Sequence, residues 1–117
     1  MEIWINPDCS KCRTALSELD AAGVDYTVRR YLEDTPTADE LAEVVHRLGV
    51  EPWQIARDAE TAAIGNPPTR DADHRGEWLA FLADHPQAIQ RPIITADDGT
   101  AVIGRDPETL ASVISRA

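Results

Sequence analysis

Hydrophobic and polar positions divide the chain into a β-α-β start, a helical middle and a β-β-α end. The start combines a short apolar strand over 2–5 with a helix from Ser10 to Ala22, in which apolar side chains recur at helical spacing. Gly23 ends this helix, and β-branched and aromatic residues over 24–31 predict a second strand. We therefore expect a β-α-β unit.

The middle of the chain carries helical signals. Residues 37–40 form a capping box, and apolar residues then follow at positions i, i+3, i+4 and i+7 up to a stop at Gly49. Short helices are expected over 55–68. A further helix through 78–82 should end near Pro86, because the residue before a proline avoids the helical region. The middle is therefore expected to add helices to the fold.

The end of the chain predicts a hairpin followed by a helix. Apolar strands over 92–95 and 101–103 flank an Asp-Asp-Gly-Thr turn at 97–100. Asp106 is a suitable N-cap and Pro107 a suitable first helical residue for a closing helix. This order of elements predicts an α/β fold with one small mixed four-stranded sheet.

Length, composition and charge exclude several classes of protein. The 117 residues fit one domain, 43% of them are hydrophobic, and no apolar run approaches the ~20 residues of a membrane span. The first residues lack the features of a secretory signal, so we expect a cytoplasmic protein. A net charge of −10 repels nucleic acids and anionic membranes, and neither is expected as a partner. An anionic substrate would need a local cluster of cations.

The two cysteines of the chain, Cys9 and Cys12, form a Cys-Ser-Lys-Cys motif between a strand and a helix, where thioredoxin-like redox motifs occur. Cys9 meets the unpaired N–H groups and the positive end of the helix dipole, and Lys11 and Arg13 add positive charge, whereas Asp8 opposes it. Cys12 lies one turn inside the helix on its apolar face. We expect Cys9 to be the reactive thiolate and Cys12 to stay neutral within disulfide reach.

Two other roles for the cysteines fit the sequence less well. A zinc site would need further ligands, but there is no second cysteine pair and the three histidines, at 46, 74 and 85, have no ligand spacing. A purely structural role suits Cys12 but not Cys9, which follows a proline turn. We expect redox or nucleophilic chemistry with no metal and no organic cofactor.

Two segments carry a resemblance to a known family. Asn-Pro-Asp-Cys-Ser-Lys-Cys-Arg at 6–13 and Gln-Arg-Pro-Ile-Ile at 90–94 resemble the hallmark segments of the ArsC/Spx family, the thioredoxin-fold arsenate reductases and their relatives. The resemblance implies a thioredoxin-like fold and a single ArsC-like domain over 1–117. In that domain the thioredoxin-like parts span about 1–35 and 87–117, and a helical insertion spans about 36–86.

The resemblance also implies a set of site residues. Cys9 matches the nucleophile of the arsenate reductases, and Arg57, Arg91 and Arg105 match the three arginines that hold the oxyanion. Guanidinium forks bind tetrahedral oxyanions through two hydrogen bonds, a geometry that lysine lacks. Pro92 resembles the cis-proline that faces the active cysteine in thioredoxin-like folds. Any one arginine in a chain with ten could be a surface residue, so the joint match carries the inference.

The chain departs from the glutaredoxin-coupled members at two positions. Those members carry serine where Cys12 stands and a histidine where this chain has Ile5. Cys12 could therefore act as an internal resolving thiol, or a small cellular thiol could take that role, with glutaredoxin or thioredoxin restoring the thiols. We expect a monomeric arsenate reductase.

Two alternatives remain open. A Spx-like regulator would bind RNA polymerase and use the cysteine pair as a disulfide switch, although such regulators generally lack the arginine that matches Arg105. A general thiol-disulfide oxidoreductase would reduce protein disulfides without any need for three arginines.

Overall fold

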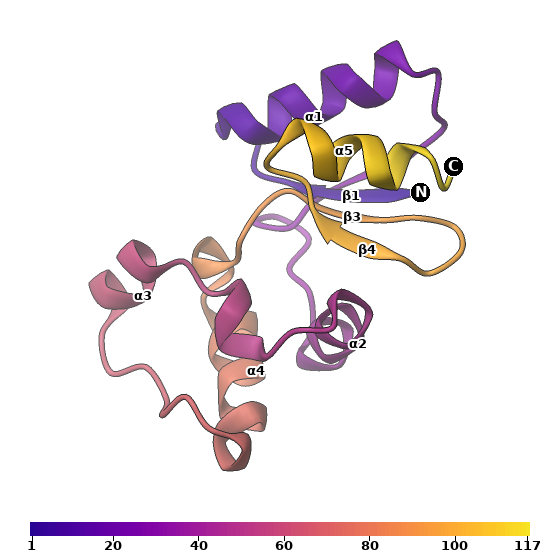
Figure 1. The fold of residues 1–117 in the computed structure, drawn as a ribbon. Helices are drawn as coiled ribbons and strands as arrows, with labels where there is room; N and C mark the ends of the chain where they lie inside the picture. Colours follow the sequence, from indigo (N-terminus) through magenta and orange to yellow (C-terminus); the bar gives the residue numbers. More distant parts are fainter. The chain divides into compact units, whose positions relative to one another are not determined.

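A mixed four-stranded sheet forms the centre of the unit that combines residues 1–34 and 91–117 (Figure 1). The computed structural model describes residues 1–117 and divides them into two compact units, 1–34 with 91–117, and 35–90. The sheet has the order β2-β1-β3-β4, with β1 parallel to β2 and antiparallel to β3, and β3 antiparallel to β4. The mixed α/β sheet expected from the sequence is confirmed. Its strands are β1 (Glu2–Ile5), β2 (Thr27–Arg30), β3 (Ile93–Thr95) and β4 (Ala101–Ile103).

Helices α1 (Ser10–Ala21) and α5 (Pro107–Ile114) lie on the same side of this sheet (Figure 1). Alternation along the strands turns one set of side chains toward the helices, and the helical repeat turns the apolar stripe of each helix toward the sheet. Burying one large aliphatic side chain in such a layer contributes about 1.5–3 kcal/mol. The buried cluster consists of Ile3, Ile5, Cys12, Ala15, Leu19, Ile94, Ala96, Leu110 and Val113.

The second strand is shorter than the sequence predicts. Its expected range was 24–31, but only Thr27–Arg30 pairs with β1. The N–H of Val24 instead donates to the carbonyl of Leu19 at 3.1 Å, because Gly23 adopts a φ of +70° and turns the chain back onto the end of α1. Val24, which β-propensity alone assigns to the strand, therefore closes the last turn of α1.

The unit over 35–90 is helical. Helix α2 (Ala38–Leu48) packs against α4 (Arg75–Asp84), and α3 (Asp58–Ile64) lies against a short 3₁₀ turn. Further 3₁₀ turns connect these helices, and the indole N–H of Trp78 donates to the carbonyl of Thr69 at 3.1 Å. The fully buried apolar side chains of this unit include Leu41, Ile55, Trp78, Leu82 and Ile89.

Two helices begin at the N-caps that the sequence predicts. The hydroxyl of Thr37 accepts from the N–H of Glu40 at 3.1 Å, and the Glu40 carboxylate accepts from the N–H of Thr37 at 3.1 Å. The carboxylate of Asp106 accepts from the N–H of Thr109 at 2.8 Å and fixes the start of α5. Both predicted N-caps are confirmed.

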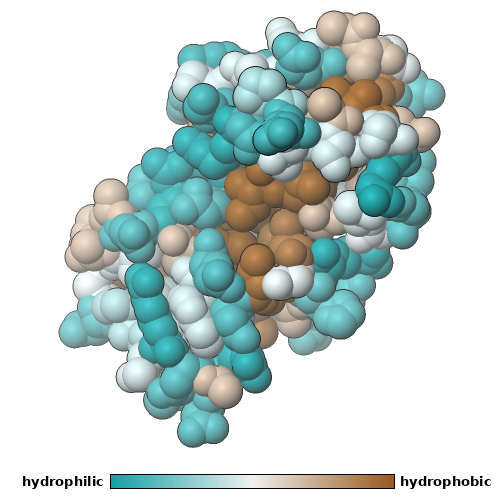
Figure 2. Space-filling view, viewed as in Figure 1, coloured by the Kyte–Doolittle hydropathy of each residue, from teal (hydrophilic) through white to brown (hydrophobic).

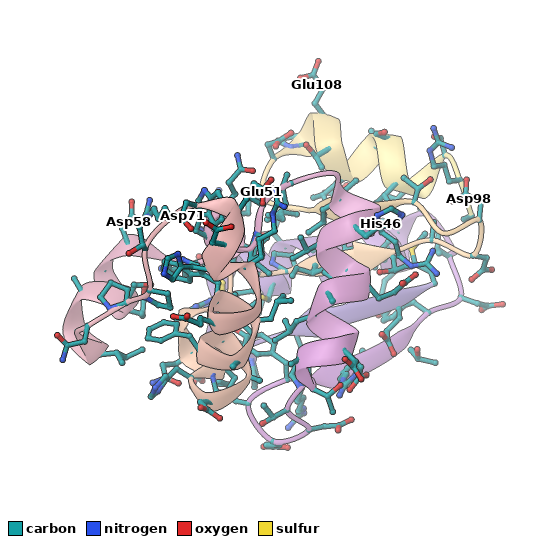
Figure 3. All side chains as sticks on the ribbon, turned by 90° about the horizontal axis from the view of Figure 1, so that it is seen from below. His46, Glu51, Asp58, Asp71, Asp98 and Glu108 are labelled. Carbon is teal, nitrogen blue, oxygen red and sulfur yellow. The ribbon has the colours of Figure 1, made fainter.

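Most of the visible face is hydrophilic, with hydrophobic residues gathered in limited patches (Figure 2). Several acidic side chains at the surface pair with arginines: Glu51 accepts from Arg75 at 2.7 Å, and Asp98 from Arg116 at 3.0 Å, whereas Glu108 points away from α5 into solvent (Figure 3). Exposed pairs of this kind add little stability. None of the helices combines the length and apolar character that crossing a bilayer requires.

The cap at Thr37 gives a first prediction. Thr37→Ala removes the acceptor for the Glu40 N–H and should lower the free energy of unfolding by about 0.5–2 kcal/mol. Thr37→Ser keeps the hydroxyl and serves as the matched control. Chemical denaturation followed by circular dichroism measures both variants, and equal losses in the two would contradict the capping role.

Candidate active site

The loop between β1 and α1 fixes the position of Cys9. The N–H of Cys9 donates to the carbonyl of Asn6 at 3.0 Å, and the side-chain oxygen of Asn6 accepts from the N–H of Asp8 at 3.0 Å. Cys9 is the N-cap of α1 with an extended backbone, and its carbonyl accepts from the N–H of Arg13 at 3.1 Å. The Asn-Pro-Asp turn therefore delivers the thiol to the N-terminal end of the helix.

The surroundings of Cys9 favour its thiolate. Burial raises the pKa of the Cys9 thiol, but hydrogen bonds to the thiolate outweigh this effect. The donors are the backbone N–H and thiol of Cys12, the backbone N–H of Lys11 and the side chain of Arg91, and they bring the pKa from the ordinary 9.0 to about 7. About half of Cys9 is therefore thiolate at neutral pH.

Cys12 has the opposite character. Its side chain is fully buried in the core between α1 and the sheet. Burial, together with the hydrogen bond to Cys9 and the charge of Cys9, raises the pKa of Cys12 from 9.0 to about 12. Both cysteines are free thiols in the structure. The buried thiol of Cys12 thus stays protonated at neutral pH and acts as a donor to Cys9.

The cation that serves Cys9 is Arg91. Its side chain donates to the Cys9 thiolate and lowers the pKa. The Arg91–Pro92 peptide bond is cis, as the family resemblance implies. The carbonyl of Pro92 accepts from the N–H of Gly104 at 2.9 Å, which joins the start of β3 to the end of β4.

Arg105 lies next to this segment. Its Nη1 donates to the carbonyl of Arg91 at 2.6 Å. Arg105 also lines a cavity of about 160 Å³, whose walls come from α1 and from the segment between β4 and α5. Lys11, Glu18 and Asp106 share that lining and give it charges of both signs.

Arg57 belongs to the other unit. It is the N-cap of α3, its Nε donates to the Glu60 carboxylate at 3.0 Å, and its N–H donates to the carbonyl of Ala88 at 2.7 Å. The structure thus brings Cys9, Cys12, Arg91 and Arg105 together within the unit that contains the sheet. Arg57 lies in the helical unit.

The side-chain charges of Lys11 and Arg13, which the sequence predicts beside Cys9, are not the groups that stabilise its thiolate. The Arg13 guanidinium donates to the carbonyl of Pro7 at 3.2 Å, and Lys11 stabilises the thiolate through its backbone N–H. The side chains of Ser10, Lys11 and Arg13 are exposed. The guanidinium that reaches the sulfur comes from Arg91, far along the chain.

Gly104 is a site residue that the sequence argument missed. A Cβ at this position would lie 2.8 Å from Cδ1 of Ile94 and 2.9 Å from Cδ2 of Leu110, closer than packed carbon atoms tolerate. The residue therefore allows the 104–105 segment to lie against the core. The signal available in the sequence was a glycine directly after a short strand and two residues before a predicted N-cap.

The geometry supports nucleophilic attack by sulfur on a negatively charged partner. The Cys9 thiolate lies at a helix N-terminus and accepts a hydrogen bond from the Arg91 side chain. The guanidinium of Arg105 in turn donates to the backbone carbonyl of Arg91. No group of three or more His, Cys, Asp or Glu side chains is arranged to hold a metal ion. These features define a thioredoxin-like α/β protein with a free cysteine at the start of its first helix.

The chain belongs to the ArsC family, whose family model matches residues 4–113. It is 59% identical to a Streptomyces viridochromogenes protein described as "Uncharacterized protein in glnII region", over 99% of this chain and 100% of that protein. It is 34% identical to an arsenate reductase of Neisseria meningitidis, over 97% of each chain. The solved structure of an arsenate reductase from Vibrio cholerae superimposes with a TM-score of 0.83 at 32% identity, over 97% of this chain and 98% of that one.

The low pKa of Cys9 gives a second prediction. Alkylation of Cys9 should follow a titration with its midpoint at about 7, and Cys12 should react little because it is buried with a pKa of about 12. Arg91→Met should move the Cys9 midpoint upward, because it removes a donor to the thiolate. Arg13→Met removes an equal charge beside the same loop and serves as the control. Peptide mass spectrometry after alkylation between about pH 5 and pH 10 gives both profiles.

The outcome against this assignment is equally clear. A Cys9 midpoint in the range of an ordinary cysteine would rule out a stabilised thiolate. An equal shift in Arg13→Met and Arg91→Met would show that general charge acts on Cys9, in place of a specific donor.

Proposed function

We propose that the protein is a cytoplasmic arsenate reductase in which Cys9 is the nucleophile. The observation that carries the proposal is the Cys9 thiolate, with a pKa of about 7, in contact with the Arg91 side chain. Oxyanion reduction by sulfur requires a thiolate and a cation at the same point, because the attacking sulfur and the arsenate are both negative. The 34% identity to the meningococcal arsenate reductase over 97% of each chain supports this substrate.

In the first step the Cys9 thiolate attacks the arsenic of arsenate. One sulfur–arsenic bond forms and one arsenic–oxygen bond breaks, and the oxygen leaves as hydroxide that takes up a proton. Arsenic remains in the +5 state. Arg91 and Arg105 stabilise the charge on the remaining oxygens, and the family resemblance assigns Arg57 to the same oxyanion role.

In the second step another thiolate attacks the sulfur of Cys9. A disulfide forms, and the electron pair of the sulfur–arsenic bond passes to arsenic, which becomes arsenite in the +3 state. The two sulfur atoms lose the two electrons that arsenic gains. Glutaredoxin, thioredoxin or a small thiol then reduces the disulfide and returns the enzyme to its starting state.

Cys12 is our first choice for the second thiol. It is three residues from Cys9 on the first turn of α1, and its thiol donates a hydrogen bond to the Cys9 sulfur. A tethered thiol has a high effective concentration, which favours it over a free thiol at millimolar level. Its burial acts in the opposite direction, because only a small thiolate fraction exists at neutral pH.

Arsenite production from arsenate tests the proposed reaction. The wild type should form arsenite when a thiol donor is supplied, and Cys9→Ser should form none. Arg105→Lys keeps the charge but loses the guanidinium fork, at about 1.5–3 kcal/mol per charged bond, so turnover should fall ten- to a hundredfold or more. Arg116→Lys at the surface pair with Asp98 is the matched control.

The same assay separates the proposal from the two alternatives. Full turnover in Arg105→Lys and Arg105→Ala would remove the oxyanion role. Capture of RNA polymerase without turnover would favour a Spx-like regulator, and reduction of protein disulfides without need of Arg91 and Arg105 would favour a general oxidoreductase.

A single turnover without added thiol tests the role of Cys12. If Cys12 resolves the intermediate, mass analysis should find a Cys9–Cys12 disulfide and one equivalent of arsenite. Cys12→Ser should stop at the first step and release no arsenite. Full activity of Cys12→Ser with a small thiol, together with no internal disulfide in the wild type, would assign Cys12 to packing and to hydrogen bonding of Cys9.

A further inference from the structure

The guanidinium of Arg105 donates a hydrogen bond to the backbone carbonyl of Arg91, and this contact fixes the backbone at Arg91. We propose that Arg105 is a positioning residue that holds the backbone of Arg91, so that the Arg91 side chain keeps its hydrogen bond to Cys9. The inference rests on the proposed function only in that Cys9 is the reactive group. It adds a role for Arg105 that is separate from contact with an oxyanion.

Two successive carbonyls of the segment that carries Arg91 are tied to the segment that carries Arg105. Nη1 of Arg105 donates to the carbonyl of Arg91 at 2.6 Å, and the N–H of Gly104 donates to the carbonyl of Pro92 at 2.9 Å. The first of these bonds comes from a charged donor, which makes it stronger than a bond between neutral groups. Removing the Arg105 head group leaves only the second tie.

The segment that provides these ties is itself held in place. Gly104 is packed so closely that a Cβ would lie 2.8 Å from Ile94, and Ile103 directly before it pairs with Ile93. On the other side, Asp106 caps α5. Arg105 therefore projects from a short segment anchored at both ends, and its guanidinium can impose a position on a neighbour.

The Arg91 side chain connects the backbone that Arg105 holds to the sulfur of Cys9. It is half-buried, and its hydrogen bond is one of those that lower the pKa of Cys9. Hydrogen bonds weaken steeply with angle and distance, so a displaced Arg91 backbone would cost Cys9 a donor. Arg105 thereby acts on Cys9 through Arg91.

Positioning and substrate binding can coexist in one guanidinium. Arg105 has five N–H donors in a planar fork, and the bond to the Arg91 carbonyl uses Nη1. Arg105 also lines the cavity that Lys11 shares. The two roles can therefore be separated by substitution.

A double-mutant cycle on Cys9 alkylation tests the inference in buffer free of any oxyanion. The wild type is compared with Arg105→Met, Arg91→Met and the double variant, with Arg116→Met as the charge-matched control, because its guanidinium pairs with Asp98 at the surface. Arg105→Met should slow alkylation at pH 7 about threefold or more, because less of Cys9 is thiolate. In the Arg91→Met background it should have no further effect. Arg116→Met should alkylate as the wild type does.

Arg105→Lys and salt distinguish the two roles of Arg105. Lysine keeps a charged donor for the Arg91 carbonyl, so alkylation should stay close to wild type even where arsenate turnover is lost. The slowing in Arg105→Met should also persist at 1 M salt, where a through-space charge effect is screened within about 3 Å. Failure of arsenate turnover in the wild type would overturn the proposed function alone, because the alkylation cycle does not depend on it.

Two results would overturn the inference itself. One is wild-type alkylation in a folded Arg105→Met. The other is an equal slowing by Arg105→Met with and without Arg91, which would show that Arg105 acts on Cys9 directly. Should Arg105→Met not fold, Arg105→Gln, whose shorter side chain removes the same guanidinium bond, takes its place in the cycle.

Discussion

A thiolate that is partly withdrawn from water can persist only where donors replace the water it loses, and this requirement governs the unit that contains the sheet. Two backbone N–H groups come from the first turn of α1, one thiol from Cys12 and one guanidinium from Arg91. The helix contributes its donors because they have no partner within the helix itself. Arg91 contributes because β3 pairs with β1, which brings the start of one strand beside the end of the other.

Local sequence predicted the elements well where one physical signal dominated. The capping box at Thr37 and the N-cap at Asp106 fixed two helix starts, because a side-chain acceptor and a nearby N–H are sufficient to define such a cap. The range of β2 was wrong at its start, since Gly23 let the chain close the last turn of α1 with Val24. That choice depends on competition between a helix end and a strand, which propensity summed along the chain does not resolve.

The place of Cys9 at the start of a helix was predictable from the sequence, whereas the groups that act electrostatically on Cys9 were much less so. The motif placed Cys9 at a helix start, but proximity in sequence favoured Lys11 and Arg13 as its cations, and their side chains are exposed. Arg91 is the cation whose side chain hydrogen-bonds to the Cys9 sulfur. It lies 82 positions after Cys9 in the sequence (91 − 9), and the pairing of β3 with β1 brings it close to Cys9. Family resemblance supplied this residue, whereas spacing and composition could not.

The reaction that we propose makes two opposite demands on Cys12, first as a hydrogen-bond donor to Cys9 and then as a second thiolate. While Cys9 is a thiolate, burial and the bond to that thiolate keep Cys12 protonated, and the proton it shares in turn stabilises Cys9. When the Cys9 sulfur becomes bonded to another atom, the thiolate charge that raised the pKa of Cys12 disappears, although its burial does not. In the proposed reaction, loss of that charge lowers the pKa of Cys12 at the step where a second thiolate is required, while its burial still disfavours the thiolate.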